Sequence, residues 1–64
     1  MIEPVRNALL HALAHVSTEA RLAALDEWEE RAAIMQHMGE MPRAEAEERA
    51  GELIARKHGK ELRP

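Results

Sequence analysis

The sequence predicts an all-α protein of two or three helices, built around an antiparallel helical hairpin. Apolar side chains recur at spacings of three and four residues over three segments, which is the period of an amphipathic helix. Gly39 follows the second segment and Pro42 opens the third. A glycine with positive φ commonly ends a helix, and a proline suits the first helical position. Because so short a loop turns neighbouring helices back alongside each other, the second and third segments form the hairpin.

The first expected helix covers about residues 4–16. Pro4 suits its opening turn, where a backbone N–H has no partner within the helix. Leu10 lies outside the main apolar stripe and widens the buried face, which indicates contact with more than one neighbour. The stripe consists of Val5, Leu9, Ala12, Leu13 and Val16.

The second expected helix covers about residues 18–38. Ser17 or Thr18 can accept hydrogen bonds from the free N–H groups at its start, and Glu19 suits the positive end of the helix dipole. No glycine or proline separates this helix from the first, so one continuous helix over residues 4–38 is an alternative. The apolar positions are Leu22, Leu25, Trp28, Ala32, Met35 and Met38.

The third expected helix covers about residues 42–57, and its apolar stripe is thin. Gly59 provides a second helix stop. Residues 58–64 are then expected to form a frayed tail. The stripe consists of Ala46, Ala50, Leu53 and Ile54.

The chain of 64 residues is expected to form a single small helical domain over residues 1–64. Its apolar fraction is 45%, but much of that is alanine, and Trp28 is the only aromatic residue. So few large side chains leave a chain of this size with little surface to bury. We therefore expect a homodimer, or a chain that is firm only when bound to a partner.

The expected compartment is the cytoplasm. The chain contains no cysteine, which excludes disulfides and thiolate metal sites. Its first residues lack the charged start, apolar run and cleavage site of a secretory signal. No run of about 20 apolar residues is present for a membrane-spanning helix, so no membrane contact is expected.

His11 and His15 are the candidate metal ligands, because two histidines four residues apart on a helix can bind one ion. The zinc-protease pattern needs a glutamate after the first histidine, and here that residue is Ala12. Glu19 or His58 would have to approach as a third ligand. The alternative is two solvated histidines on a helix face, and we expect no metal and no cofactor.

The acidic residues do not predict an enzyme. General acid–base catalysis needs carboxylates that are desolvated in a cleft, and a hairpin this small offers little cleft. Ser17 and Thr18 are explained as helix caps, and no glycine-rich phosphate loop is present. The carboxylates in the middle of the chain are Asp26, Glu27, Glu29, Glu30, Glu45, Glu47, Glu48 and Glu52.

The preferred hypothesis for function is non-enzymatic binding to another protein. Methionine is the adaptable residue of binding surfaces, and a tryptophan can anchor an interface. The alternative is that these side chains fill the hairpin's own core or a dimer seam. The candidate partner-binding residues are Trp28, Ile34, Met35, Met38 and Met41. An acidic face suited to a basic groove on a partner is formed by Glu27, Glu30, Glu45 and Glu48.

The second hypothesis is a small DNA-associated accessory or regulatory protein, since two helices around Gly39 resemble a helix-turn-helix in outline. Residues 26–52 hold nine acidic and three basic side chains, whereas phosphate contacts require basic ones. A basic cluster near the C-terminus either touches a DNA backbone nonspecifically or stabilises the end of a helix. It consists of Arg56, Lys57, Lys60 and Arg63.

One motif extends through the predicted hairpin, over about residues 27–55. Its residues are Glu27-Trp28-Glu29-Glu30-Arg31-Ala32-Ala33-Ile34-Met35, then Gly39, then Pro42-Arg43-Ala44-Glu45-Ala46-Glu47-Glu48-Arg49-Ala50. The motif resembles a helical-hairpin tail found in many small proteins of bacteriophages and mobile elements, although residues 37–41 depart from the turn usual in those tails. The resemblance implies a phage or mobile-element accessory protein that binds and modulates a host protein, and it brings no catalytic residue.

Overall fold

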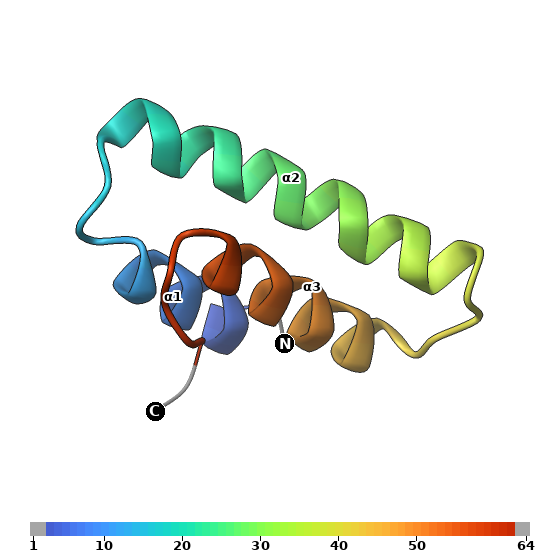
Figure 1. The fold of residues 1–64 in the computed structure, drawn as a ribbon. Helices are drawn as coiled ribbons and strands as arrows, with labels where there is room; N and C mark the ends of the chain where they lie inside the picture. The colour runs from blue at the N-terminus through green and yellow to red at the C-terminus, as the bar shows by residue number, and fades with distance from the viewer. Residues whose placement is uncertain (1–2, 63–64) are drawn as a thin grey trace.

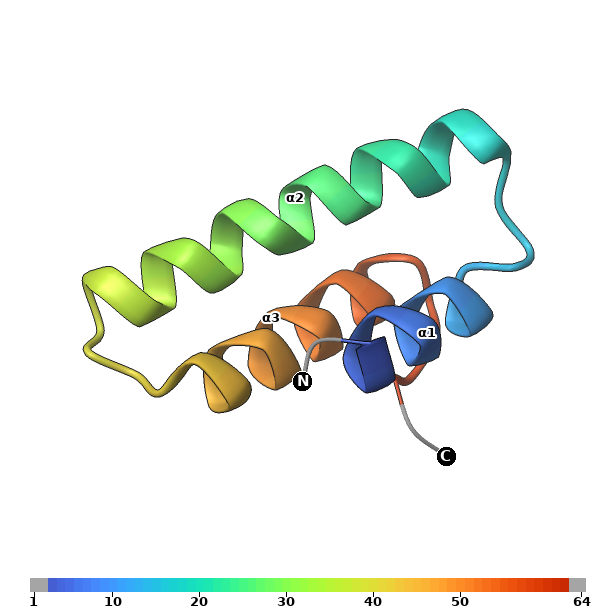
Figure 2. The ribbon, with the colours of Figure 1, turned by 180° about the vertical axis from the view of Figure 1, so that it is seen from behind.

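The computed structural model describes residues 3–62 and is all-α, as predicted (Figure 1). Its helices are α1 (Glu3–Ala12), α2 (Thr18–His37) and α3 (Arg43–Lys57), and the described residues include no strand. α2 runs along one side of the molecule, and α1 and α3 lie together on the other, as the view from behind also shows (Figure 2). α3 contacts both other helices. The predicted antiparallel hairpin, with the first helix packed on it, is confirmed.

The turn between α2 and α3 is built differently from the prediction. The residue with positive φ is Glu40, at 51°, and not Gly39. Gly39 continues the helical hydrogen bonding, since its amide donates to the Met35 carbonyl at 3.1 Å, and the Met41 amide donates to the same oxygen at 3.2 Å. A Cβ on Gly39 would lie 2.9 Å from that oxygen. Gly39 is therefore required for space beside the backbone of α2, and the left-handed conformation falls on its neighbour.

The connection between α1 and α2 rules out one continuous helix. α1 ends at Ala12, four residues before its predicted end, and the amides of Ala14 and Val16 bond to carbonyls only three residues back. Ser17 then has extended backbone, and its Oγ accepts a hydrogen bond from the Ala20 amide at 3.2 Å. The two helices are thus separate without glycine or proline, and the Ser17 hydroxyl satisfies a free N–H at the start of α2.

α3 ends at Lys57, two residues before the predicted glycine stop. Gly59 has φ of 77°, its amide donates to the Arg56 carbonyl, and the Lys60 amide donates to the Ala55 carbonyl, both at 2.9 Å. These two bonds are the Schellman arrangement, which turns the chain back on its helix. The prediction of a frayed tail is wrong for residues 58–62, because this reversal brings Leu62 into the core at 6% exposure. Residues 63–64 lie outside the described residues.

One hydrophobic core joins the three helices and the returning segment. Trp28 is its largest side chain, and the abundant alanines of α2 and α3 allow close packing around it. The core members are Val5, Leu9, Leu13, Ala24, Leu25, Trp28, Ala32, Ala50, Ile54, Ala55 and Leu62. In the described part of the chain, none of the helices has both the length and the apolar character needed to cross a membrane.

Candidate protein-binding surface

Trp28, the proposed interface anchor, belongs to the protein's own core. Its side chain is 2% exposed, and its indole Nε1 donates a hydrogen bond to the Glu47 carbonyl at 2.9 Å. The bond joins α2 to α3 in the middle of the hairpin. A buried indole with a satisfied N–H stabilises the hairpin and presents no surface to a partner. Trp28 therefore fits the alternative interpretation, in which it fills the hairpin's own core.

The other candidate residues divide between surface and core. Ile34 is 52% exposed and Met38 is 82% exposed. They lie four residues apart on α2 and therefore on the same side of that helix. Met35 is half-buried and packs against the core, and Met41 is half-buried in the turn. The apolar surface at this end of the hairpin thus rests on Ile34 and Met38.

Leu53 joins this surface from α3, and sequence reasoning missed it. The side chain is 47% exposed, whereas we expected it in the buried stripe of the third helix. A signal was present, because Leu53 and Ile54 are consecutive and two consecutive residues of a helix point in different directions. Ile54 is 1% exposed and occupies the core position. We call the surface formed by Ile34, Met38 and Leu53 the open flank.

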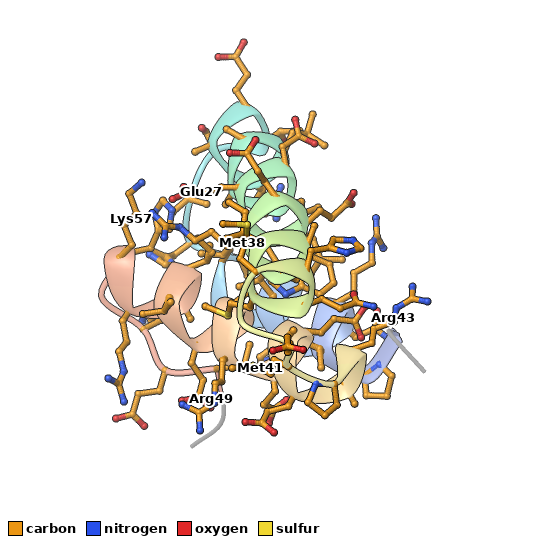
Figure 3. All side chains as sticks on the ribbon, turned by 90° about the vertical axis from the view of Figure 1, so that its right-hand side faces the viewer. Glu27, Met38, Met41, Arg43, Arg49 and Lys57 are labelled. Carbon is orange, nitrogen blue, oxygen red and sulfur yellow. The ribbon has the colours of Figure 1, made fainter. Side chains whose placement is uncertain are left out.

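Two shallow depressions adjoin Leu53 on the open flank. One is about 230 Å³ and lies between Met35 of α2 and the α3 residues Arg49, Leu53 and Arg56. The other is about 220 Å³ and lies between Arg31 of α2 and Leu53. Figure 3 views the hairpin from its turn, with Met38, Glu27 and Lys57 on one side of α2 and Arg43 on the other. The open flank thus lies on the side of α2 that carries Glu27, away from Arg43.

The opposite side of the seam is covered by α1. Arg6 of α1 and Arg43 of α3 line the same depression, of about 330 Å³, over Trp28 and Ala32. Closer to the core, a Cβ built on Gly51 would lie 3.1 Å from Val5 of α1. In the described chain the hairpin therefore has a third helix on one side of its seam and none on the other.

An ion-pair cluster borders the open flank. Lys57 Nζ lies 3.0 Å from Glu27 Oε1, and Arg31 Nε lies 3.3 Å from Glu27 Oε2. The hydrogen bond from Lys57, followed by that from Arg31, lowers the pKa of the Glu27 carboxyl below its ordinary value of 4.5. This cluster ties the start of the flank on α2 to the end of α3.

The expected acidic face is not uniformly free to meet a basic partner. Glu27 holds Arg31 and Lys57, and Glu45 is bonded to Arg49 at 3.2 Å. The two depressions of the open flank are lined by four cations and two carboxylates. The cations are Arg31, Arg49, Arg56 and Lys57, and the carboxylates are Glu27 and Glu52. Glu30 is exposed and Glu48 is half-buried.

The two candidate metal ligands do not share a helix face, because α1 ends at Ala12 before His15 is reached. His15 packs across the molecule, with Nδ1 3.1 Å from the Ala12 carbonyl and Nε2 3.3 Å from the His58 carbonyl. Among residues 3–62, no three side chains of the types that bind metal are gathered at one point. The arrangement gives His15 a structural role, joining the α1–α2 connection to the end of α3.

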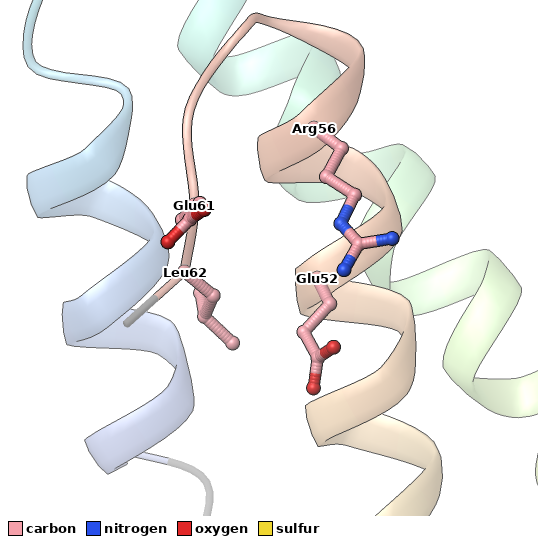
Figure 4. Close-up of a pocket in the computed structure, with 4 residues that line it drawn as sticks. All are labelled: Glu52, Arg56, Glu61 and Leu62. Carbon is pink, nitrogen blue, oxygen red and sulfur yellow. The ribbon is translucent and has the colours of Figure 1, made fainter. Parts of the chain in front are cut away.

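A further depression, of about 250 Å³, lies where the returning segment meets α3. Glu52 and Arg56 stand on α3, and Glu61 and Leu62 stand on the segment (Figure 4). Because Leu62 is itself part of the core, this depression marks the seam between segment and helix.

Comparisons with known protein families, with curated proteins and with solved structures give no match to this chain.

Proposed function

We propose that this chain is a non-enzymatic protein-binding module whose open flank contacts a partner protein. The observation that carries the proposal is the exposure of Ile34, Met38 and Leu53, each about half exposed or more, on the side of the hairpin that carries Glu27. Ile34 and Met38 lie seven and eleven residues after Glu27 on α2, and Leu53 lines a depression together with Glu27. Single exposed apolar residues are normal on a protein surface, but three large ones on one side of a small hairpin offer apolar contact to a partner. Two of the three were proposed for this role from the sequence.

The partner we propose is a cytoplasmic host protein, with the chain as a small phage or mobile-element modulator. The resemblance of residues 27–55 to helical-hairpin tails of such elements supports this context. The proposal of a binding role without catalysis is supported by the state of the carboxylates near the flank. Glu27 and Glu45 are engaged by arginine or lysine on the surface, an arrangement typical of stabilising ion pairs.

The test compares what tagged variants capture from a lysate of the cells that make the protein. Ile34→Gln and Leu53→Gln remove apolar contact without changing charge, and Leu22→Gln is the matched control. Leu22 is 59% exposed on α2 but lies on a different side of that helix from Ile34. We expect one captured protein to fall about tenfold with either flank variant and to be retained by the control.

Equal capture by the wild type and all three variants, measured by quantitative mass spectrometry, would rule out the open flank as the interface. Far-UV circular dichroism of each variant checks that the helices are intact. All three positions are helical and exposed, so glutamine is compatible with the fold at each of them.

Two expectations from the sequence stay predictions. The homodimer is tested by unfolding at concentrations about a hundredfold apart, since the midpoint of a dimer rises with concentration. The DNA-associated alternative is tested by retention on duplex DNA at low and high salt. The sequence of the hairpin does not favour it, because residues 26–52 hold nine acidic and three basic side chains.

A further inference from the structure

On the open flank, the surface between α2 and α3 has room for one more helix. On the opposite side of the α2–α3 seam, α1 contributes Val5 to the core and Arg6 to the surface depression. On the open flank, Met35 of α2 and Leu53 of α3 line the depression between the two helices. Ile34 and Met38 are exposed beside Met35 on α2, and no described helix covers them. Grooves between two helices with apolar side chains on both walls are the usual receivers of an amphipathic helix.

The apolar side chains of the flank are too few to hold a partner alone. Fully burying a leucine, isoleucine or methionine contributes about 1.5–3 kcal/mol, and roughly half of Ile34 and Leu53 is already buried. Association also costs at least about 4 kcal/mol in lost freedom of motion. The charges around the flank must therefore contribute to affinity or to partner choice.

These charges favour an acidic partner. The two depressions beside Leu53 are lined by four cations and two carboxylates, in a chain whose net charge is −3. Arg56 forms no salt bridge with another described residue, and Arg49 is bonded only at its Nε to the exposed Glu45. Both guanidinium groups are free to donate further hydrogen bonds to carboxylates, and such charge-assisted bonds are stronger than neutral ones.

We propose that the open flank binds an amphipathic helix of another protein whose apolar stripe is edged by glutamate or aspartate. Its apolar side chains would cover Ile34, Met38 and Leu53, and its carboxylates would meet Arg49 and Arg56 on α3. This inference rests on the proposed function and specifies the chemistry of the partner.

A second copy of this chain is a poorer occupant of the same flank. A two-fold interface pairs a patch with itself, so the excess of positive charge in the lining of one copy, four cations against two carboxylates, would meet the same excess on the other. Like charges brought together across an interface oppose association, and this selects against the self-complex.

The experiment uses two synthetic helical peptides, each about 18 residues long, with identical leucine stripes. One carries glutamates along both edges of the stripe and the other carries lysines. Fluorescence anisotropy with the full chain measures both dissociation constants at low salt and at high salt. We expect the glutamate peptide to bind at least about tenfold more tightly, with the difference shrinking as salt screens the charges.

Variants then locate the binding site. Ile34→Gln and Leu53→Gln should each weaken binding of the glutamate peptide about tenfold, while Leu22→Gln should leave it within about twofold. The double variant Arg49→Gln/Arg56→Gln should remove most of the preference for the glutamate peptide. Its matched control, Arg6→Gln/Arg21→Gln, makes the same change in net charge away from the flank and should retain the preference.

Equal binding of the two peptides, binding of neither, or equal weakening by the Leu22 control would overturn this inference. So would self-association lost in Leu53→Gln, measured by sedimentation, because a second copy would then occupy the flank. The proposed function fails separately. If the flank variants still lose a captured protein from lysate while the glutamate peptide does not bind, the interface stands and the partner's chemistry is different.

Discussion

The turn between α2 and α3 separates two requirements that one glycine usually meets. Gly39 supplies space, since a Cβ there would press on the Met35 carbonyl at 2.9 Å. Glu40 adopts the left-handed backbone, which a side chain makes unfavourable. The sequence placed a glycine stop at the correct point of the chain, but spacing alone does not show which of two adjacent residues has positive φ.

We predict that Gly39→Ala lowers the free energy of unfolding by about 1–3 kcal/mol, because a backbone atom cannot move aside cheaply. Glu40→Gly should raise it by about 0.5–1 kcal/mol, since glycine adopts φ of 51° without a steric penalty. Urea unfolding of both variants measures these changes. Alanine tolerated at 39 would contradict the close approach to the Met35 carbonyl, and glycine harmful at 40 would contradict the left-handed conformation of Glu40.

The exposure of a candidate site residue could be predicted from the sequence where it depends only on the position of that residue on its own helix. Ile34 lies outside the apolar positions expected for α2 and is exposed, whereas Met38 and Leu22 were among those positions and are exposed as well. The exposure of Trp28 and of Leu53 depends instead on how two helices pack together. Trp28 is buried in the core between the helices, where the Glu47 carbonyl of α3 accepts a hydrogen bond from its N–H, and Leu53 is exposed because α1 lies on the other side of the hairpin. Neither fact is contained in the period of one helix.

At the scale of the elements, the start of α2 depends on a single hydroxyl. We predict that Ser17→Ala lowers the free energy of unfolding by about 1 kcal/mol, because the Ala20 amide loses its acceptor. Ser17→Asp should preserve the cap. Thr18→Ala is the control, since the Thr18 hydroxyl accepts only an exposed hydrogen bond from Arg21. More helical far-UV signal together with unchanged stability in Ser17→Ala would show that α1 and α2 can join.

The contact between α1, α3 and the returning segment is set by Gly51. A Cβ there would lie 3.1 Å from side-chain atoms of both Val5 and Leu62. We predict that Gly51→Leu lowers the free energy of unfolding by about 1–3 kcal/mol through overpacking. Gly51→Ala should have a smaller effect, because its gain in helix propensity of about 1 kcal/mol offsets the tight contact.

Urea unfolding measures both Gly51 variants, and Glu52→Leu, on the exposed face of the same helix turn, is the control. Limited proteolysis gives an independent readout, because displacing Leu62 should make the segment after Gly59 easier to cleave. Full tolerance of leucine at position 51, with no change in proteolysis, would contradict the packing of Leu62 against α3.

At the scale of the whole molecule, the helices and the hairpin could be predicted from the period of the apolar residues, the helix-capping residues and the glycine and proline stops in the sequence. What did not follow is which side of the hairpin α1 covers. That choice depends on Gly51, whose missing side chain gives Val5 and Leu62 room on one side of α3. It leaves the open flank on the other side. The prediction that the C-terminal segment is frayed was wrong for the same reason. The space that Leu62 occupies exists only once α1 and α3 have packed together.

The Glu27–Lys57–Arg31 cluster links the two long helices beside the flank, and it gives the molecule a pH dependence of known sign. The folded state lowers the pKa of Glu27, so the stabilisation is fully present above pH 4.5 and is lost as the pH falls through the folded-state pKa.

We predict that Glu27→Gln lowers the free energy of unfolding at neutral pH by about 0.2–1 kcal/mol, a small amount because solvent screens an exposed pair. The gap between wild type and Glu27→Gln should shrink as the pH falls below 4.5, close once the pH is below the folded-state pKa, and narrow in high salt. Glu30→Gln is the control on the same helix, since Glu30 forms no salt bridge with another described residue. Urea unfolding across this pH range measures the gap, and a gap that stays constant down to the lowest pH would mean that packing of the Glu27 side chain, and not its charge, joins α2 to α3.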